Sequence, residues 1–125
     1  MGVFDAIAGR RTAKQVEGDA GEEQALRFLQ EHGLKLVERN FRCKGGEIDL
    51  VMQDGRGLVF VEVRKRAGSG YGGAAASVTA RKQARLVIAA QTFLQRYTMP
   101  PPCRFDVIAI DGPALEWLKN AIEAC

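Results

Sequence analysis

The sequence predicts an α/β protein in which one mixed sheet is flanked by helices. A helix-like segment opens the folded part, three short strand-like segments follow, and a long amphipathic helix precedes a fourth strand. The order αβββαβ suits helices packed against the faces of one sheet. We therefore expect a single α/β domain.

Length and composition support this expectation. The chain has 125 residues, of which 46% are hydrophobic and 26% charged, as in ordinary globular domains. We expect a loose basic N-terminal segment at residues 1–16 and one domain at residues 17–125. The longest apolar run, Leu86–Ala90, is far shorter than the roughly 20 residues that span a bilayer, and the start lacks the apolar core of a secretory signal. A cytoplasmic protein without a membrane partner is expected.

The first helix should begin with Asp19 as its N-cap and end at Gly33. His32, the only histidine, directly precedes that glycine. We expect it to complement the carbonyl groups at the helix end rather than to act in catalysis. Between the two ends, apolar side chains recur at helical spacing and predict a buried face: Ala25, Leu26, Phe28 and Leu29.

Three strands are expected next, at Leu34–Glu38, Glu47–Met52 and Leu58–Arg64, because these segments are rich in β-branched and apolar residues. Five residues join the second strand to the third. They include Asp54-Gly55, a good hairpin signal, although their number leaves the turn type open. The second and third strands should pair antiparallel.

The long helix carries the strongest periodic signal of the chain. It should begin near Thr79 and end before Pro100–Pro102. Arg104–Ile110 is then expected as the fourth strand, and Ala114–Cys125 is an ambiguous last element for which a helix is considered. The apolar face of the long helix comprises Leu86, Ala89, Ala90, Phe93, Leu94 and Tyr97.

Two strands carry acidic side chains on one predicted face. Ile48 and Leu50 flank Asp49, so we expect both of them on the face opposite to that carboxylate. In the next strand, Glu62 and Arg64 share a face. If the hairpin pairs in phase, the carboxylates of Asp49 and Glu62 converge on one side of the sheet.

The first helix offers a third carboxylate, Glu22, which precedes apolar residues at i+3, i+4 and i+7 and so lies on the buried side. Oxygen donors without histidine or thiolate suit Mg²⁺ or Mn²⁺, and such an ion favours hydrolysis of a phosphodiester. Two other interpretations stay open. Glu22 could form a capping box with Asp19, and the strand charges could form solvated cross-strand pairs.

Several motifs resemble one known family. They are Gly21-Glu22, Asn40-Phe41-Arg42, the G-G-E-I-D-L of residues 45–50, the V-F-V-E-V-R of residues 59–64, and Arg104-Phe105-Asp106-Val107. Over about residues 17–122 the chain resembles the YraN family of uncharacterised bacterial proteins. That family is similar to the restriction-endonuclease-like superfamily, near archaeal Holliday-junction resolvases, with an αβββαβ core and a site written D-x(n)-E-x-K.

The resemblance implies that Glu22, Asp49 and Glu62 hold Mg²⁺ or Mn²⁺ with help from the Val63 carbonyl. Arg64 occupies the position of the lysine and completes the implied catalytic set. This replacement departs from the superfamily pattern. A guanidinium has a pKa above about 12 and does not act as a base, although it can orient water or stabilise negative charge.

A basic region surrounds the long helix. From Arg64 to Arg104 there are eight basic residues and no acidic one. On the helix, Arg81, Arg85 and Arg96 flank the apolar face, as phosphate-binding residues do, although a solvated helix face has the same pattern. The residues expected to bind nucleic acid are Arg42, Lys44, Lys65, Arg66, Tyr71, Arg81, Lys82 and Arg85.

Two functions are therefore expected. The first is a nucleic-acid-binding protein of endonuclease-like fold that hydrolyses phosphodiesters in branched or structured DNA with a divalent metal. The second is a non-catalytic nucleic-acid-binding module that retains the carboxylates, and Arg64 favours this alternative. Because junction resolvases act as pairs, a homodimer is considered by analogy.

Overall fold

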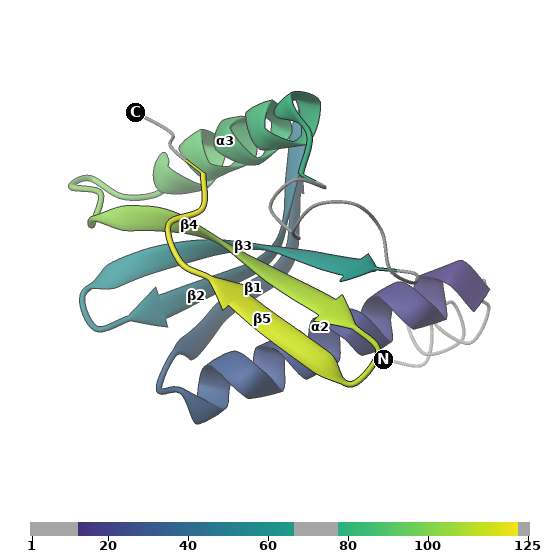
Figure 1. Ribbon diagram of the computed structural model, residues 1–125. Helices are drawn as coiled ribbons and strands as arrows, with labels where there is room; N and C mark the ends of the chain where they lie inside the picture. The colour runs from purple at the N-terminus through teal and green to yellow at the C-terminus, as the bar shows by residue number, and fades with distance from the viewer. Residues whose placement is uncertain (1–12, 67–77, 123–125) are drawn as a thin grey trace, which may run out of the picture.

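The computed structural model describes residues 13–66 and 78–122, and their five strands form one sheet in the order β1-β2-β3-β4-β5. Strands β3 and β4 pair parallel, and the other neighbours pair antiparallel. The fold is thus the predicted α/β class, consistent with an endonuclease-like core (Figure 1). The elements are α2 (Ala13–Glu31), β1 (Lys35–Cys43), β2 (Gly46–Asp54), β3 (Gly57–Arg66), α3 (Ala80–Leu94), β4 (Cys103–Asp111) and β5 (Ala114–Leu118).

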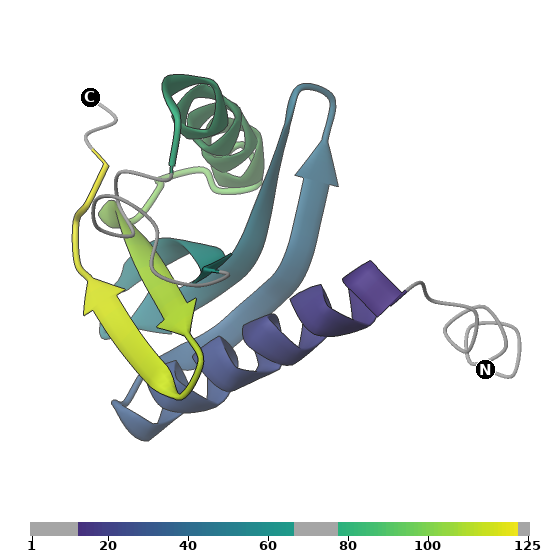
Figure 2. The same cartoon turned by 45° about the vertical axis from the view of Figure 1, so that its right-hand side comes forward.

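Helices α2 and α3 lie on opposite faces of the sheet (Figures 1 and 2). The sheet therefore has a buried cluster on each side. On the α3 side, Phe60 and Phe93 are fully buried, and on the α2 side Leu29 and Val61 are fully buried. Neither helix in the described part of the chain is long and apolar enough to cross a membrane.

Helix α2 begins earlier than predicted. It starts at Ala13, so Asp19 lies within the helix and the predicted N-cap at that residue is wrong. The residues from Ala13 to Gln15 are good helix formers, which explains why the helix continues past the apparent start signal. The end is as predicted, because Gly33 adopts a φ of +92°, a conformation that favours glycine.

The histidine also behaves as predicted. His32 lies just past the last turn of α2, and its Nδ1 is 2.8 Å from the carbonyl oxygen of Phe28. The ring of His32 also packs against that of Phe28, with centroids 4.1 Å apart. The side chain is therefore used to complete the helix end.

The hairpin between β2 and β3 is confirmed, with a shorter loop than the sequence suggested. Asp54 pairs with Gly57, so only Gly55 and Arg56 form the loop. Strand β1 is longer than predicted and continues to Cys43. In its second half Phe41 and Cys43 pack against the core and Asn40 and Arg42 are exposed, but the polar run Glu38-Arg39-Asn40 interrupts the alternation that marks a half-buried strand.

The tip of the β1–β2 hairpin packs closely against α3. A Cβ atom at Gly46 would collide with the backbone carbonyl of Arg85, so the strand can approach the helix only because this residue is glycine. Figure 2 shows the hairpin rising beside α3. This contact fixes the position of the hairpin relative to the helix.

Helix α3 begins as predicted and buries the predicted face, but it ends at Leu94, so Arg96 and Tyr97, which were expected on the helix, lie beyond its end. Thr79 is the N-cap, and its side chain accepts a hydrogen bond from the backbone N–H of Lys82 at 3.2 Å. The buried residues are four of those predicted from the periodicity: Leu86, Ala89, Ala90 and Phe93.

The last element is a strand, so the helix considered for residues 114–125 is wrong within the described residues. Strand β5 pairs with β4 and places Trp117 opposite Ile108. Gly112 adopts a φ of +59° in the connection between the strands. A helix was considered because this short segment has no clear period, and its pairing depends on contacts with β4 that local sequence does not report.

Candidate active site

The pairing of β2 with β3 ends beside the predicted carboxylates. The ladder runs from Asp54 back to Leu50, which pairs with Val61. One residue further, Oδ2 of Asp49 accepts a hydrogen bond from the backbone N–H of Val63 at 2.8 Å. A side-chain carboxylate therefore serves as acceptor at the point where the backbone ladder ends.

The strand is irregular at this point. Ile48 is buried in the cluster on the α3 side, whereas Leu50 is buried in the cluster on the α2 side. The prediction that these two residues share a face is therefore wrong. Pairing with β1 also leaves out Asn40 and Asp49, which lie between the pairs Arg39–Leu50 and Phe41–Ile48, and the φ of Asn40 is +52°. Strict alternation does not hold around Asp49 because both paired strands depart from regular geometry there.

Asp49 and Glu62 come together as predicted. Burial raises the pKa of Asp49, and the hydrogen bond from Val63 opposes this effect. Burial and the charge of Asp49 raise the pKa of Glu62 to about 7. The two carboxyl groups also share a hydrogen bond that lowers the pKa of Asp49 and raises that of Glu62. Within the pair, Glu62 therefore has the more strongly raised pKa.

Glu22 lies beside this pair, next to Asp49. Burial raises the pKa of Glu22, and the charge of Asp49 raises it further, while the amide of Asn40 lowers it. Its Oε1 atom is buried without a hydrogen-bond partner among the described residues. Because α2 begins at Ala13, the alternative in which Glu22 belongs to a capping box with Asp19 is excluded.

Two cations border Glu62. Its Oε2 atom lies 3.6 Å from Nη1 of Arg64 and 3.8 Å from Nζ of Lys82. Arg64 is on the same strand, as predicted from alternation, whereas Lys82 comes from α3. The side chain of Glu62 is only 13% exposed, so these ion pairs are better shielded from solvent than ordinary surface pairs.

The predicted metal ligands have the oxygen donors that a divalent cation prefers, but their side chains are not grouped around one point. Within residues 13–66 and 78–122, no three side chains of His, Cys, Asp or Glu are grouped closely enough to hold one ion. The donor atoms are nevertheless oxygens, which Mg²⁺ and Mn²⁺ prefer. The unpartnered Oε1 of Glu22 and the repulsion between Asp49 and Glu62 are both features that a cation would relieve. The role of the Val63 carbonyl as a metal ligand stays a prediction.

Most of the predicted nucleic-acid-binding residues lie on the surface around α3. The contact of Gly46 with α3 brings the hairpin tip beside the helix. Arg66 ends β3, and Tyr71 lies outside the described residues. Arg42 also forms an ion pair with Glu47, with 3.7 Å between Nε and Oε2. The exposed residues of this set are Arg42, Lys44, Lys65, Arg81, Lys82 and Arg85, and together they are called the basic surface below.

Arg96 does not belong to that surface in the way the sequence suggested. Its Nη1 lies 3.2 Å from Oε1 of Glu38. Its guanidinium also stacks on Phe93, with 3.7 Å between the Cζ atom and the ring centroid. Arg96 is therefore engaged within the protein, and the periodicity of α3 alone could not reveal this partner, because Glu38 lies 58 residues away in sequence.

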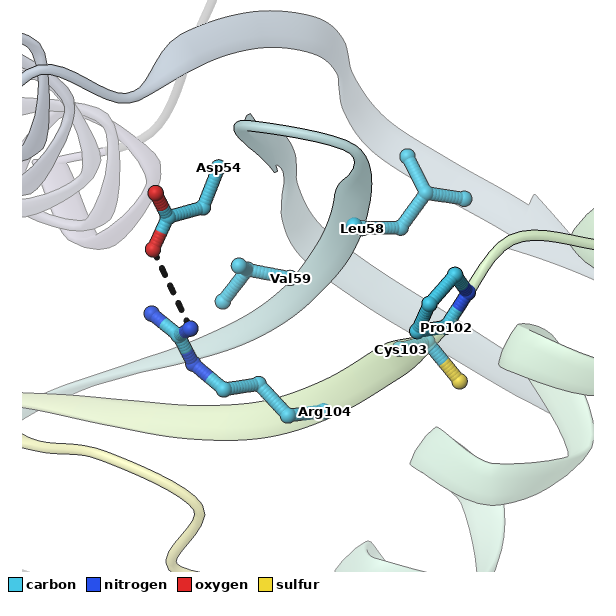
Figure 3. A pocket seen from close by; sticks show the side chains of 7 residues that line it. Asp54, Leu58, Val59, Pro102, Cys103 and Arg104 are labelled. Atoms are coloured by element: carbon cyan, nitrogen blue, oxygen red, sulfur yellow. Dashed lines mark ion pairs between the residues drawn. The ribbon is translucent and has the colours of Figure 1, made fainter.

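A small pocket lies at the start of β3 and β4, and neither Asp49 nor Glu62 lines it (Figure 3). Its volume is about 140 Å³. An ion pair crosses its wall, with 3.1 Å between Nη1 of Arg104 and Oδ2 of Asp54. None of the predicted site residues lines it; the lining residues are Asp54, Gly57, Leu58, Val59, Pro102, Cys103 and Arg104.

Sequence reasoning missed the part played by Asn40. The residue stands in one of the motifs quoted above, yet its residue type alone suggested no role there. Its left-handed backbone and its contact with Glu22 place it beside the carboxylates. The available signal was that asparagine tolerates the left-handed conformation better than most other side chains that carry a Cβ.

Comparison with known proteins agrees with the resemblance. A family model described as the uncharacterised protein family UPF0102 matches residues 21–110. A UPF0102 protein of Herminiimonas arsenicoxydans is 71% identical over 114 residues, covering 91% of this chain and 92% of the relative. A second, from Janthinobacterium sp. (strain Marseille), is 70% identical over 114 residues, covering 91% and 93%. The chain therefore belongs to the uncharacterised family UPF0102, the YraN family.

Proposed function

We propose that this protein is a cytoplasmic, metal-dependent nuclease that hydrolyses phosphodiester bonds in branched or otherwise structured DNA. The observation that carries the proposal is the buried pair of Asp49 and Glu62. Two carboxyl groups are brought together at the end of a strand ladder, where burial disfavours the charged form of both and the charge of Asp49 disfavours that of Glu62. Such an arrangement is costly for folding, and strongly perturbed carboxyls of this kind are typical of functional sites.

The chemistry follows from the side chains. Asp49 and Glu62, with Glu22 beside Asp49, are the residues that would hold Mg²⁺ or Mn²⁺. When bound, such an ion makes water more acidic and offsets negative charge at phosphorus. Arg64, held against Glu62, carries a permanent charge that can orient water or stabilise the charge that develops on the phosphate oxygens.

The basic surface supports nucleic acid as the substrate. Phosphate contacts from Lys and Arg supply most of the affinity for DNA, whatever its sequence. The hairpin tip with Lys44 lies beside the helix with Arg81 and Arg85, and Lys82 of that helix reaches Glu62. A polyanion bound there would have its backbone close to Asp49 and Glu62.

The proposal is tested by incubating the purified protein with branched, flapped and linear DNA, and with matched RNA, in Mg²⁺, Mn²⁺ or EDTA. We expect metal-dependent cleavage of structured DNA that is lost in Asp49→Asn and Glu62→Gln. These variants keep the shape and one oxygen acceptor of each carboxyl, so the fold should persist. Cleavage that is equal in the variants and the wild type would point to a contaminating nuclease and would refute the proposal.

A second candidate is a nucleic-acid-binding module without catalysis. It is favoured by the absence, among the described residues, of a ready group of three metal ligands and by Arg64 in place of a lysine. In that case DNA should bind in a salt-dependent way with or without metal. Neither the wild type nor the two variants should cut it.

A further inference from the structure

Lys82 reaches the carboxylate pair from a different layer of the molecule. Its backbone N–H is held by the side chain of the N-cap Thr79 at 3.2 Å, which fixes the first turn of α3. From there its Nζ atom lies 3.8 Å from Oε2 of Glu62. The lysine is thus anchored at its backbone and directed towards the site on β3.

Lys82 is more exposed to solvent than Arg64, the other cation beside Glu62. The side chain of Lys82 is 47% exposed, whereas that of Arg64 is 26% exposed. The charge of Lys82 lowers the pKa of both Asp49 and Glu62, so it acts electrostatically on both members of the pair. Its ammonium group has three donors, and the contact with Glu62 leaves donors for a ligand.

A phosphodiester that approaches two carboxylates is repelled unless a cation meets it. We propose that Lys82 binds a non-bridging oxygen of the phosphate at the Asp49–Glu62 pair and is the primary amine of this site, which β3 does not supply because it carries Arg64. The inference rests on the proposed function, since it assigns a substrate contact within that reaction.

The protons are accounted for without the lysine. During hydrolysis a water oxygen forms a bond to phosphorus, and the bond from phosphorus to one ester oxygen breaks. The water releases a proton to solvent and the departing oxygen takes one from solvent. Lys82 stays charged throughout and stabilises the negative charge on the phosphate oxygen, a contribution that matters most where charge develops.

The test compares Lys82→Ala with Arg81→Ala. Arg81 is an exposed cation one position earlier on α3, about 100° around the helix, so it controls for the loss of one positive charge. Cleavage rates are measured at saturating protein, and the Kd for the same DNA is measured in EDTA. We expect Lys82→Ala to lower the rate about 100-fold, with a change in Kd no larger than that of Arg81→Ala. Thermal unfolding curves verify that both variants fold.

A double variant sharpens the result. Adding Arg64→Lys to Lys82→Ala places a primary amine on β3, and we expect it to recover at least about tenfold of the lost rate. A rate in Lys82→Ala equal to that of Arg81→Ala, or no recovery in the double variant, overturns the role of Lys82 while the nuclease assignment stands. A wild-type protein that cuts no DNA in any metal overturns the nuclease assignment and this inference with it.

Discussion

The carboxylate of Asp106 accepts a hydrogen bond from the indole Nε1 of Trp117 at 3.0 Å, which joins the middle of β4 to β5. Asp106 is fully buried, and Arg104 Nε and the backbone N–H of Asn120 also donate to it, at 3.1 and 2.8 Å. One side chain therefore ties the last strand and the turn after it to β4.

Removing this carboxylate should be strongly destabilising. We expect Asp106→Ala to lower the free energy of unfolding by about 3 kcal/mol, because the guanidinium of Arg104 and two N–H groups lose a buried acceptor. Trp117→Phe removes one of these bonds and should cost about 1 kcal/mol. Urea unfolding measures both. Equal losses in the two variants would mean that Asp106 is not the shared acceptor that the geometry indicates.

The close approach of the β1–β2 hairpin to α3 makes a prediction at Gly46. Gly46→Ala places a methyl group against the backbone carbonyl of Arg85, and a helix backbone cannot move aside as a side chain does. We expect a loss of about 3 kcal/mol in unfolding free energy. Gly21→Ala is the matched control: its Cβ would lie 3.8 Å from Cδ1 of Ile110, an ordinary contact, so it should stabilise the helix by up to about 1 kcal/mol.

The pKa of Glu62 predicts how stability depends on pH. In the folded protein this pKa is raised from 4.5 to about 7, so between these values the folded state binds more protons than the unfolded state. Ionising the buried Glu62 therefore destabilises the fold. Below pH 4.5 this cost is absent, and the free energy of unfolding falls as pH rises, until it is lower by about 3 kcal/mol above pH 7. Urea unfolding in EDTA from about pH 5 to 8 measures the slope.

The variant Glu62→Gln isolates this effect. It cannot ionise, so we expect it to be more stable than the wild type at about pH 8 and to lose most of the slope between about pH 5 and 7. If a cation binds the carboxylates, Mg²⁺ should stabilise the wild type at about pH 8 and leave the variant less affected. An unchanged slope in Glu62→Gln would assign the pH dependence to other groups.

Arg85 and Arg96 should separate DNA binding from stability. Arg85 is exposed on α3, so Arg85→Ala should weaken DNA binding and reduce the slope of log K against log salt by about 0.9 for each phosphate that this side chain neutralises. Arg96→Ala should instead cost about 1 kcal/mol of folding free energy through its stacking on Phe93 and its pair with Glu38. Fluorescence anisotropy across salt concentrations and urea unfolding distinguish the two. The opposite pattern would place Arg96 on the binding surface.

The fold was predictable from sequence where local pattern decides the structure. Helix α3 was indicated by Thr79 and a regular apolar stripe, and β3 by its β-branched run. The start of α2 and the identity of β5 were not predictable in this way. Asp19 has the residue type of an N-cap, and only the helical conformation of the residues before it shows that it lies inside α2. Strand β5 depends on Asp106, a partner 11 residues away from Trp117.

The meeting of Asp49 and Glu62 was predictable from the sequence, and the local backbone geometry was less so. Alternation placed Glu62 and Arg64 together, and the hairpin brought Asp49 to them. Alternation failed at Ile48 and Leu50, because the irregular conformation of β2 depends on Asn40 of the paired strand and on the bond from Val63 to Asp49. Lys82 was predicted as one of the nucleic-acid-binding residues and not as a neighbour of Glu62, since no sequence spacing relates the first turn of α3 to β3.

The hydrogen bond from the Val63 N–H gives Asp49 a structural role in addition to its proposed role in metal binding. A relative without nuclease activity would still need an acceptor for that N–H, so folding alone would disfavour the loss of Asp49. Glu62 accepts no such backbone bond in the described chain and is freer to change. Among relatives, a glutamate at position 62 should therefore indicate the proposed nuclease activity better than an aspartate at position 49 does.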